Sequence, residues 1–408
     1  MSDKRSRLRK VNNKRGSSAV FLTVIMATLM SITLALIYGV TEETKKSTVD
    51  AVVNLAGDSL LSEFDRKLLE EYGLFLLKGT DEELSRKLHS YISYSLDDMK
   101  NVKTISVEAS AGRFSLTDPA VIKDQLLEYT KMAEAEGLLK DKGSSETTSM
   151  ENRTLRYGPA ISSLPSTGIP SPSLTSTAES LADKAKDVEA AFKAGTDTYL
   201  LNRYILTHFN RKDTIVNSNH FFRNEAEYIL GGELSDRKNE KRVEIALKAM
   251  RFPINMAYLY SDPKKQAALA AAAQAMTPGA AAVATQAALA STWAYAESDN
   301  DVELLWEGYK VPMVKDESTW AIELDTAIEG VFRGTIIPAQ QKGYDYDEYL
   351  QILLFFQNEN IKLARIMDLI QINMRAEYDS DFLICEYSTG VTVKVKVDGK
   401  THTHEKRY

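Results

Sequence analysis

The sequence has little of what metal centres, disulfide frameworks and nucleophilic active sites are built from. Its 408 residues include one cysteine, Cys385, and five scattered histidines. A single thiol forms neither an intramolecular disulfide nor a multi-thiolate zinc site. A glycine-rich phosphate loop, a G-x-S-x-G elbow and an H-E-x-x-H pair are also missing. We therefore expect no catalytic residue, no cofactor and no metal site, and a protein that is not an enzyme.

Acidic residues are nearly missing from the first 18 positions. Asp3 is the only one there, so this arm carries a charge of +6 and leaves −13 for the rest of a chain whose total is −7. An acidic body repels phosphate backbones, which argues against a nucleic-acid partner. The arm directly precedes an apolar run, so a topogenic role explains it better. Its basic residues are Lys4, Arg5, Arg7, Arg9, Lys10, Lys14 and Arg15.

Charged residues are missing altogether from residues 19–40. About 22 helical residues at 1.5 Å each cross the roughly 30 Å hydrocarbon core of a bilayer, so this run is predicted to be a transmembrane helix. A cleaved secretory signal is the alternative, but the run is longer than a normal signal core and no small-x-small site follows it. Seven basic residues precede the run and only Lys45 and Lys46 follow closely, so the positive-inside rule places the N-terminus in the cytoplasm. Residues 41–408 then face the cell exterior.

A second uncharged window covers residues 266–296, and about half of it is alanine. Alanine is near neutral on membrane-insertion scales, and three glutamines and a Thr277-Pro278-Gly279 breaker oppose a second span. The window is therefore predicted to be an alanine-rich helical hairpin that turns at Pro278-Gly279 and packs inside the outer domain.

The rest of the chain is predicted to be mainly α with a small antiparallel β-sheet. The helical period continues past the membrane run to Tyr72, which predicts one long stem helix ending at Gly73. The segment 143–180 is rich in Ser, Thr, Pro and Gly, which is typical of an exposed linker; a glycosylated stalk or a recognition strand is the alternative. The predicted order is a basic arm (1–18), a transmembrane helix (19–40), a helical stem with a small α/β part (41–142), a linker (143–180), a helical extracellular domain (181–376), and a β-hairpin with a tail (377–408).

Two patterns locate the small sheet. Residues 102–109 alternate as a strand does, and so do residues 391–397. We expect residues 382–387 to form a hairpin with 391–397 across Ser388-Thr389-Gly390, and the strand at 102–109 to pair with it. A helix is predicted over 345–376, beginning with a capping box of Asp345 and Glu348.

Several polar groups suggest chemistry but have simpler interpretations. The carboxylates of residues 345–348 fit a helix N-terminus better than a cation site. The run Asp299-Asn300-Asp301 lacks the glycine and glutamate of a calcium loop and is interpreted as a polar loop. His402 and His404 are interpreted as part of a solvated tail, and Cys385 as a buried, inert thiol. The three tryptophans are interpreted as packing residues.

The N-terminal order of basic residues, Gly16, Ser17 and a long apolar helix resembles the class III signal of type IV pilins. It is most similar to the TadE and TadG pseudopilins of tight-adherence (Tad) pili. That resemblance implies cleavage by a prepilin peptidase between Gly16 and Ser17, with the apolar helix left to anchor the subunit. The chain departs from the pilin pattern at Phe21, where the family normally carries a glutamate that pairs with a neighbouring N-terminal amine.

A resemblance over nearly the whole chain is to an uncharacterised membrane-anchored family of Gram-positive bacteria, often encoded beside Tad pilus genes. It implies a cell-surface accessory of a pilus or secretion machine, without an assigned activity. The tracts that carry it are 15–37, 62–77 (SEFDRKLLEEYGLFLL), 221–232 (FFRNEAEYILGG), 258–264 (YLYSDPK) and 344–356 (YDYDEYLQILLFF).

Two functions from different classes follow, beside a third alternative, an enzyme whose site is assembled from residues far apart in the sequence. The first is a noncatalytic pseudopilin-like component or accessory of a Tad-type apparatus, with the membrane, pilus or secretion-machine proteins and a prepilin peptidase as partners. Its apolar helix would pack against partner helices through small residues spaced by four, or these residues merely face lipid. The second is a stand-alone ligand-binding or sensory ectodomain. The small residues are Ala27, Ser31, Ala35 and Gly39.

Overall fold

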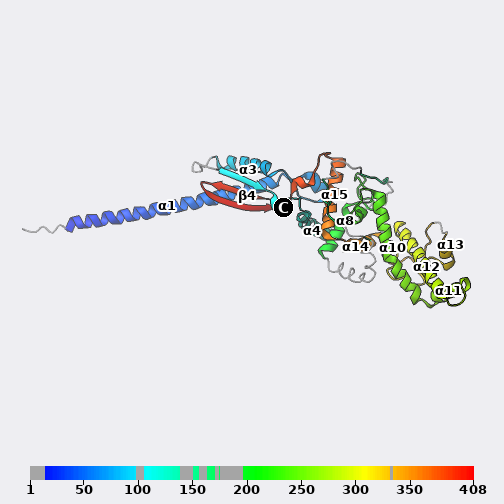
Figure 1. Ribbon diagram of the computed structural model, residues 1–408. Helices are drawn as coiled ribbons and strands as arrows, with labels where there is room; N and C mark the ends of the chain where they lie inside the picture. Colours follow the sequence, from blue (N-terminus) through cyan, green and yellow to red (C-terminus); the bar gives the residue numbers. More distant parts are fainter. Residues whose placement is uncertain are drawn as a thin grey trace, which may run out of the picture. The chain divides into compact units, whose positions relative to one another are not determined.

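The structure is a computed structural model that describes residues 14–97, 105–137, 150–155, 163–170, 174, 196–330 and 334–408. The described residues form two compact units (Figure 1). The first unit combines the N-terminal residues up to Glu63 with Asp81–Ser110 and Val391–Lys406. The second combines Phe64–Thr80, Ala111–Gly390 and Arg407–Tyr408. Neither unit is one continuous stretch, so the units do not follow the order of segments predicted from the sequence.

Helix α1 (Lys14–Leu61) dominates the first unit and changes character along its length. Its apolar part is bare: the side chains from Val20 to Val40 are exposed. The later part buries Val49, Val53, Ala56 and Leu60, whose spacing of three or four residues forms one helix face. It is the one helix, among the residues described, that is long and apolar enough to cross a membrane.

The predicted stem helix to Tyr72 is wrong in its second half. Helix α1 ends at Leu61, and α2 (Arg66–Tyr72) begins again in the second unit. Asp65 caps α2 by accepting hydrogen bonds from the backbone N–H groups of Lys67 and Leu68, which stabilises a new helix start. Gly73 ends α2 with a left-handed φ of 68°.

The three-stranded sheet of the first unit has the order β2-β4-β5. Strand β2 pairs antiparallel with β4, with Val107 opposite Val395. This confirms the antiparallel sheet and the pairing of the 102–109 region with the C-terminal strands; residues 102–104 lie outside the described residues. The valines of β4 alternate inward, as a half-buried strand requires. The elements are α3 (Asp81–Leu96), β2 (Ile105–Ser110), β4 (Gly390–Val397) and β5 (Lys400–Arg407).

The hairpin has a different second strand from the one predicted. Strands β4 and β5 are joined by Asp398-Gly399, whose φ angles are 46° and 84°. An Asp-Gly pair with two positive φ angles is the turn that matches the twist of antiparallel strands. The expected partner, residues 382–387, instead contains a 3-10 turn, Ile384–Glu386, and the first residue of β3 (Tyr387–Ser388). Strand β3 pairs with β1 (Leu77–Lys78).

The second unit is helical and has a large apolar core, with a separate apolar cluster around Trp293. Helix α15 lies at the centre of the large core, since all residues from Ile361 to Met374 are buried. The helix predicted over 345–376 is two helices, because Asn358 caps α15 through the N–H of Ile361. The capping box of Asp345 and Glu348 is confirmed at α14. The helices are α4 (Lys123–Ala135), α8 (Asp197–His208), α9 (Glu225–Gly231), α10 (Asp236–Ser261), α13 (Leu324–Glu329), α14 (Tyr346–Phe356) and α15 (Glu359–Glu377).

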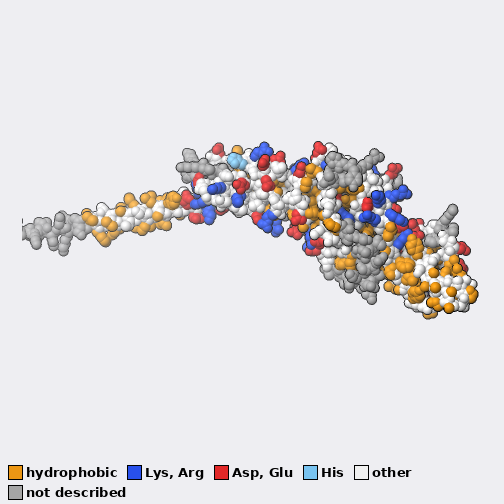
Figure 2. Space-filling model, viewed as in Figure 1, with side chains coloured by type: hydrophobic (Ala, Val, Ile, Leu, Met, Phe, Trp, Pro, Cys, Tyr) orange, Lys and Arg blue, Asp and Glu red, His pale blue; other side chains and the backbone are white. Residues whose placement is uncertain are grey.

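The alanine-rich window forms the predicted hairpin, α11 (Pro263–Met276) and α12 (Ala282–Trp306). One face packs around Trp293, whose ring meets that of Trp320 edge to face at 5.6 Å. The hairpin is not enclosed as expected. Met276, Val283 and Tyr295 are exposed, and Figure 2 shows apolar side chains gathered over α11 and α12. The second half of α12 is buried on most sides, but α11 and the first half of α12 leave their outer alanines, such as Ala271 and Ala284, in solvent.

The parts of the segment 143–180 that the structure describes pack against the helices, in contrast to the exposed linker predicted. Met150 and Leu164 are buried. The N–H of Ser166 donates to Asp368 of α15 at 3.0 Å. The rest of that segment, and residues 181–195 of the predicted helical domain, lie outside the described residues.

Candidate functional site

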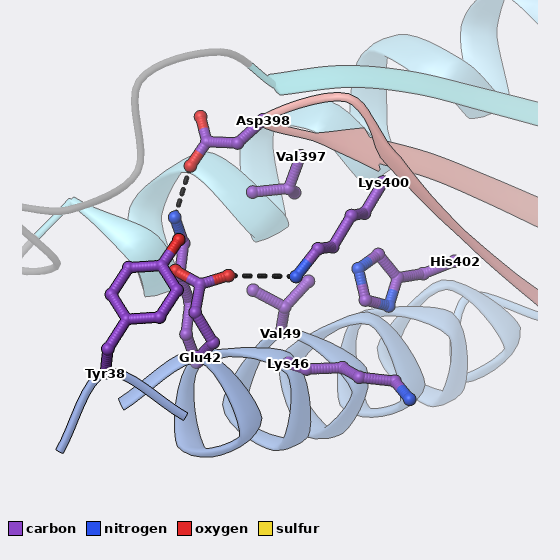
Figure 3. A pocket seen from close by; sticks show the side chains of 9 residues that line it. Tyr38, Glu42, Lys46, Val49, Val397, Asp398, Lys400 and His402 are labelled. Atoms are coloured by element: carbon purple, nitrogen blue, oxygen red, sulfur yellow. Dashed lines mark hydrogen bonds and ion pairs between the residues drawn. The ribbon is translucent and has the colours of Figure 1, made fainter. Parts of the chain in front are cut away.

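A polar cavity of about 430 Å³ lies in the first unit, where α1 leaves its apolar part and meets the tip of the β4–β5 hairpin (Figure 3). The cavity is near-neutral in charge, because ammonium and carboxylate groups both line it. Val49 and Val397 supply apolar walls. We call it the hairpin-tip pocket. Its lining residues are Tyr38, Glu42, Lys45, Lys46, Val49, Val397, Asp398, Lys400 and His402.

Two ion pairs join the hairpin tip to α1 across this pocket. Lys400 Nζ lies 2.8 Å from Glu42 Oε2, and Lys45 pairs with Asp398 at the turn. Figure 3 shows Lys46 extending along the helix, away from these two pairs. The hydrogen bond from Lys400 lowers the pKa of Glu42, and the pKa of Lys400 is raised in return. Both groups are therefore charged at neutral pH.

The same pattern continues along α1. His402 Nδ1 lies 2.6 Å from Asp50, and Lys406 Nζ lies 2.6 Å from Asp58. The hydrogen bond to His402 lowers the pKa of Asp50. The expectation of a solvated histidine tail is therefore wrong: His402 is buried in β5. Alternate strand residues share a face, and an eight-residue step is slightly more than two helix turns. The sequence does contain a pattern that could have predicted this contact. Acidic residues recur every eight positions on the helix, and basic residues alternate on the strand: Glu42, Asp50 and Asp58, and Lys400, His402, His404 and Lys406.

The small residues predicted for helix packing all lie on the bare part of α1. They contact no other element among the residues described, and a Cβ built on Gly39 would meet nothing within 4 Å. Gly16 and Ser17 belong to the helical backbone of α1, as do Lys14 and Arg15. The other basic residues of the arm, from Lys4 to Lys10, lie outside the described residues.

The tract 221–232 forms a buried polar cluster around α9 in the second unit. Glu225 accepts hydrogen bonds from Asn210 N at 2.8 Å and from Asn373 Nδ2 at 2.6 Å, and its Oε2 lies 2.7 Å from His220 Nδ1. Glu227 accepts from the Tyr346 hydroxyl at 2.6 Å, and burial raises its pKa to about 7. These carboxylates hold neighbouring segments together, which gives the tract a structural role.

A second buried cluster corrects the interpretation of Asp299-Asn300-Asp301 as a polar loop. These residues lie inside α12, and Asp301 is fully buried. Its Oδ2 lies 3.0 Å from Arg251 Nε, and its Oδ1 lies 2.6 Å from Lys315 Nζ. Burial alone would raise the pKa of Asp301, but Arg251 and Lys315 lower it. Sequence reasoning missed this cluster because its members come from α10, α12 and the loop after α12.

Among the residues that the structure describes, Glu227 and Asp301 line neither the hairpin-tip pocket nor the cavities beside Phe252 and Asp124. Cys385 is exposed on a 3-10 turn, so the expectation of a buried thiol is wrong. The three tryptophans pack as expected: Trp293 and Trp320 are buried, and Trp306 is half-buried.

A family of unknown function (DUF5702) matches residues 121–399, about two thirds of the chain. The chain belongs to the DUF5702 family. The matched region holds both buried polar clusters and ends at Gly399, in the turn of the hairpin. Helix α1 lies outside the match. Searches of curated proteins and of solved structures find no match to this DUF5702 protein.

Proposed function

We propose that this DUF5702 protein is a single-pass surface protein with its basic arm in the cytoplasm and both folded units outside the cell. The observation that carries the proposal is helix α1, which runs unbroken from a bare apolar part into a part packed in the first unit. A bare apolar helix of this length is stable in lipid and costly in water. The positive charge of the arm favours the cytoplasmic side for the N-terminus.

The same helix supports a noncatalytic assembly role. Because α1 contains no break between residues 19 and 61, the first unit is fixed to the membrane helix without a flexible tether. Contacts between membrane helices would then set the positions of neighbouring folded units directly. The small residues Ala27, Ser31, Ala35 and Gly39 permit close approach of a partner helix. With a flexible anchor, contacts between membrane helices would not fix the positions of the folded units.

Within that role, we propose a pseudopilin-like component or accessory of a Tad-type pilus or secretion apparatus. The support is the order of features from Lys14 to the apolar helix, with Gly16-Ser17 at the position of prepilin cleavage. Phe21 replaces the usual glutamate, so this subunit lacks the carboxylate that pairs with a neighbouring amine. An accessory position beside the fibre fits that difference better than a place in its repeating core.

The test is the N-terminal sequence and intact mass of the membrane-extracted protein, expressed with and without a prepilin peptidase. We expect a start at Ser17 only when the peptidase is present. A Gly16→Leu variant is the matched control and keeps the intact arm in both hosts. An intact arm in the unaltered protein with the peptidase present would contradict processing and favour the alternative, a stand-alone membrane-anchored ligand-binding or sensory ectodomain.

A further inference from the structure

We propose that the hairpin-tip pocket binds the phosphodiester headgroup of a net anionic phospholipid in the outer face of the membrane. The proposal rests on the proposed function, since it requires that α1 spans the bilayer. It goes further by giving the first unit a lipid-recognition site. The observations that carry it are the depth of the pocket, the charge of its lining and the donors that this lining presents.

The depth of the pocket matches the headgroup layer. If the hydrocarbon core ends near Val40, then Glu42 and Lys46 lie about 3 and 9 Å beyond it along the helix axis. The headgroup region extends about 5 to 8 Å beyond the core on each side. Tyr38, which is exposed, lies at the boundary, where aromatic side chains with a polar tip are favoured. Glu42 therefore lies within the headgroup layer and Lys46 at its outer edge, so a lipid phosphate can reach the membrane-facing side of the pocket.

The charge of the lining suits one phosphodiester. Three ammonium groups and two carboxylates line the pocket, an excess of one positive charge among these five groups, and His402 in the lining is paired with Asp50 outside it. A phosphodiester carries one negative charge, so a lipid with no other charge completes the balance. A choline headgroup would add a second cation to a pocket that already has an excess of one. This difference predicts a preference for a net anionic lipid.

The lining also presents hydrogen-bond donors. An ammonium group has three N–H donors, and Lys400 uses one of them on Glu42. Lys46 makes no ion pair within the part of the chain that the structure describes, and it is exposed. Lys46 lines the same pocket, and its exposed side chain would have to turn toward a phosphate held by Lys400; neither contact requires the hairpin to detach from α1. Val49 and Val397 provide apolar contact for the glycerol carbons.

The experiment measures lipid retention by the full chain in nanodiscs that contain equal amounts of phosphatidylglycerol and phosphatidylcholine, using native mass spectrometry. We expect phosphatidylglycerol to be enriched on the protein. Lys46→Gln should reduce that enrichment about fivefold, the effect of roughly one lysine near a membrane surface. Lys46→Gln with Lys400→Gln should abolish it. The control, Lys394→Gln with Lys396→Gln, removes equal charge from exposed residues of β4 and should leave the enrichment unchanged.

Three outcomes separate the possibilities. Equal retention of both lipids, or an equal loss in the control, would overturn the proposal. Displacement of phosphatidylglycerol by millimolar inorganic phosphate would assign the pocket to a free phosphate and overturn the lipid source. Because Lys46 makes no described ion pair, its single variant tests binding without loosening the hairpin. Failure of the protein to float with liposomes would contradict the proposed membrane anchor itself, which is a different result from flotation without lipid preference.

Discussion

A cluster of buried charged residues links α10, α12 and the loop after α12 in the second unit. Arg251, Asp301 and Lys315 are buried together, and each finds an opposite charge. A buried ion pair contributes little net stability compared with an apolar pair, but removing one partner leaves an uncompensated charge in a medium of low polarity. The cluster therefore favours one arrangement of α10 and α12 over others.

Asp301→Asn should destabilise the second unit by about 3–5 kcal/mol, because Arg251 would lose its charged partner and Lys315 would keep only Glu297. The exposed pair Lys264–Glu317 supplies the control, and Glu317→Gln should change stability by less than about 1 kcal/mol. Chemical denaturation of the full chain in detergent, followed by tryptophan fluorescence, measures both. Similar small losses in the two variants would contradict the role given to the cluster.

The stability of the second unit should also depend on pH through Glu227. Burial raises its folded pKa from 4.5 to about 7, so the folded state favours the protonated form. This contribution is fully present below pH 4.5 and is lost as pH rises to about 7, up to about 3 kcal/mol. The melting temperature of Glu227→Gln should therefore fall less between pH 5 and 7.5 than that of the unaltered protein. Parallel profiles for the two proteins would contradict this assignment.

At the scale of elements, the turn between β4 and β5 can be predicted from the local sequence, but the contacts of these strands with α1 cannot. Asp398-Gly399 between alternating residues is a strong hairpin signal. The predicted hairpin used Ser388-Thr389-Gly390 instead, because the histidines of β5 were interpreted as a tail. Their partners lie on α1, more than 340 positions earlier in the chain. Ion pairs between residues so far apart in the chain cannot be predicted from the pattern of neighbouring residues.

Gly399→Val should destabilise the hairpin by about 1–2 kcal/mol, because a β-branched residue is strained at the φ of 84° found there. The effect should be confined to β4, β5 and the part of α1 that they contact. Amide hydrogen exchange measures it as faster exchange in β5. Thr403→Val, an exposed substitution within β5, is the control and should leave exchange unchanged. Equal protection in Gly399→Val would show that the turn does not limit hairpin stability.

At the scale of the whole molecule, the sequence predicts the elements with a strong local signal. The apolar run of α1, the alanine hairpin and the capping box of α14 were all expected and are present. The units themselves were not predicted, because the first unit combines α1 with a middle segment and with the last strands. The pocket at the hairpin tip was missed for the same reason: its lining comes from residues 38–49 and 397–402.

The proposed topology, in which α1 spans the membrane and the folded units lie outside, can be tested through Cys385. It is the only cysteine and is exposed in the second unit, so a membrane-impermeant maleimide reports its side of the membrane. We predict labelling in intact cells without permeabilisation. Ser6→Cys in a Cys385→Ser background should be labelled only after permeabilisation. If Cys385 reacts only after permeabilisation, or if the protein is recovered in the soluble fraction, this topology is contradicted.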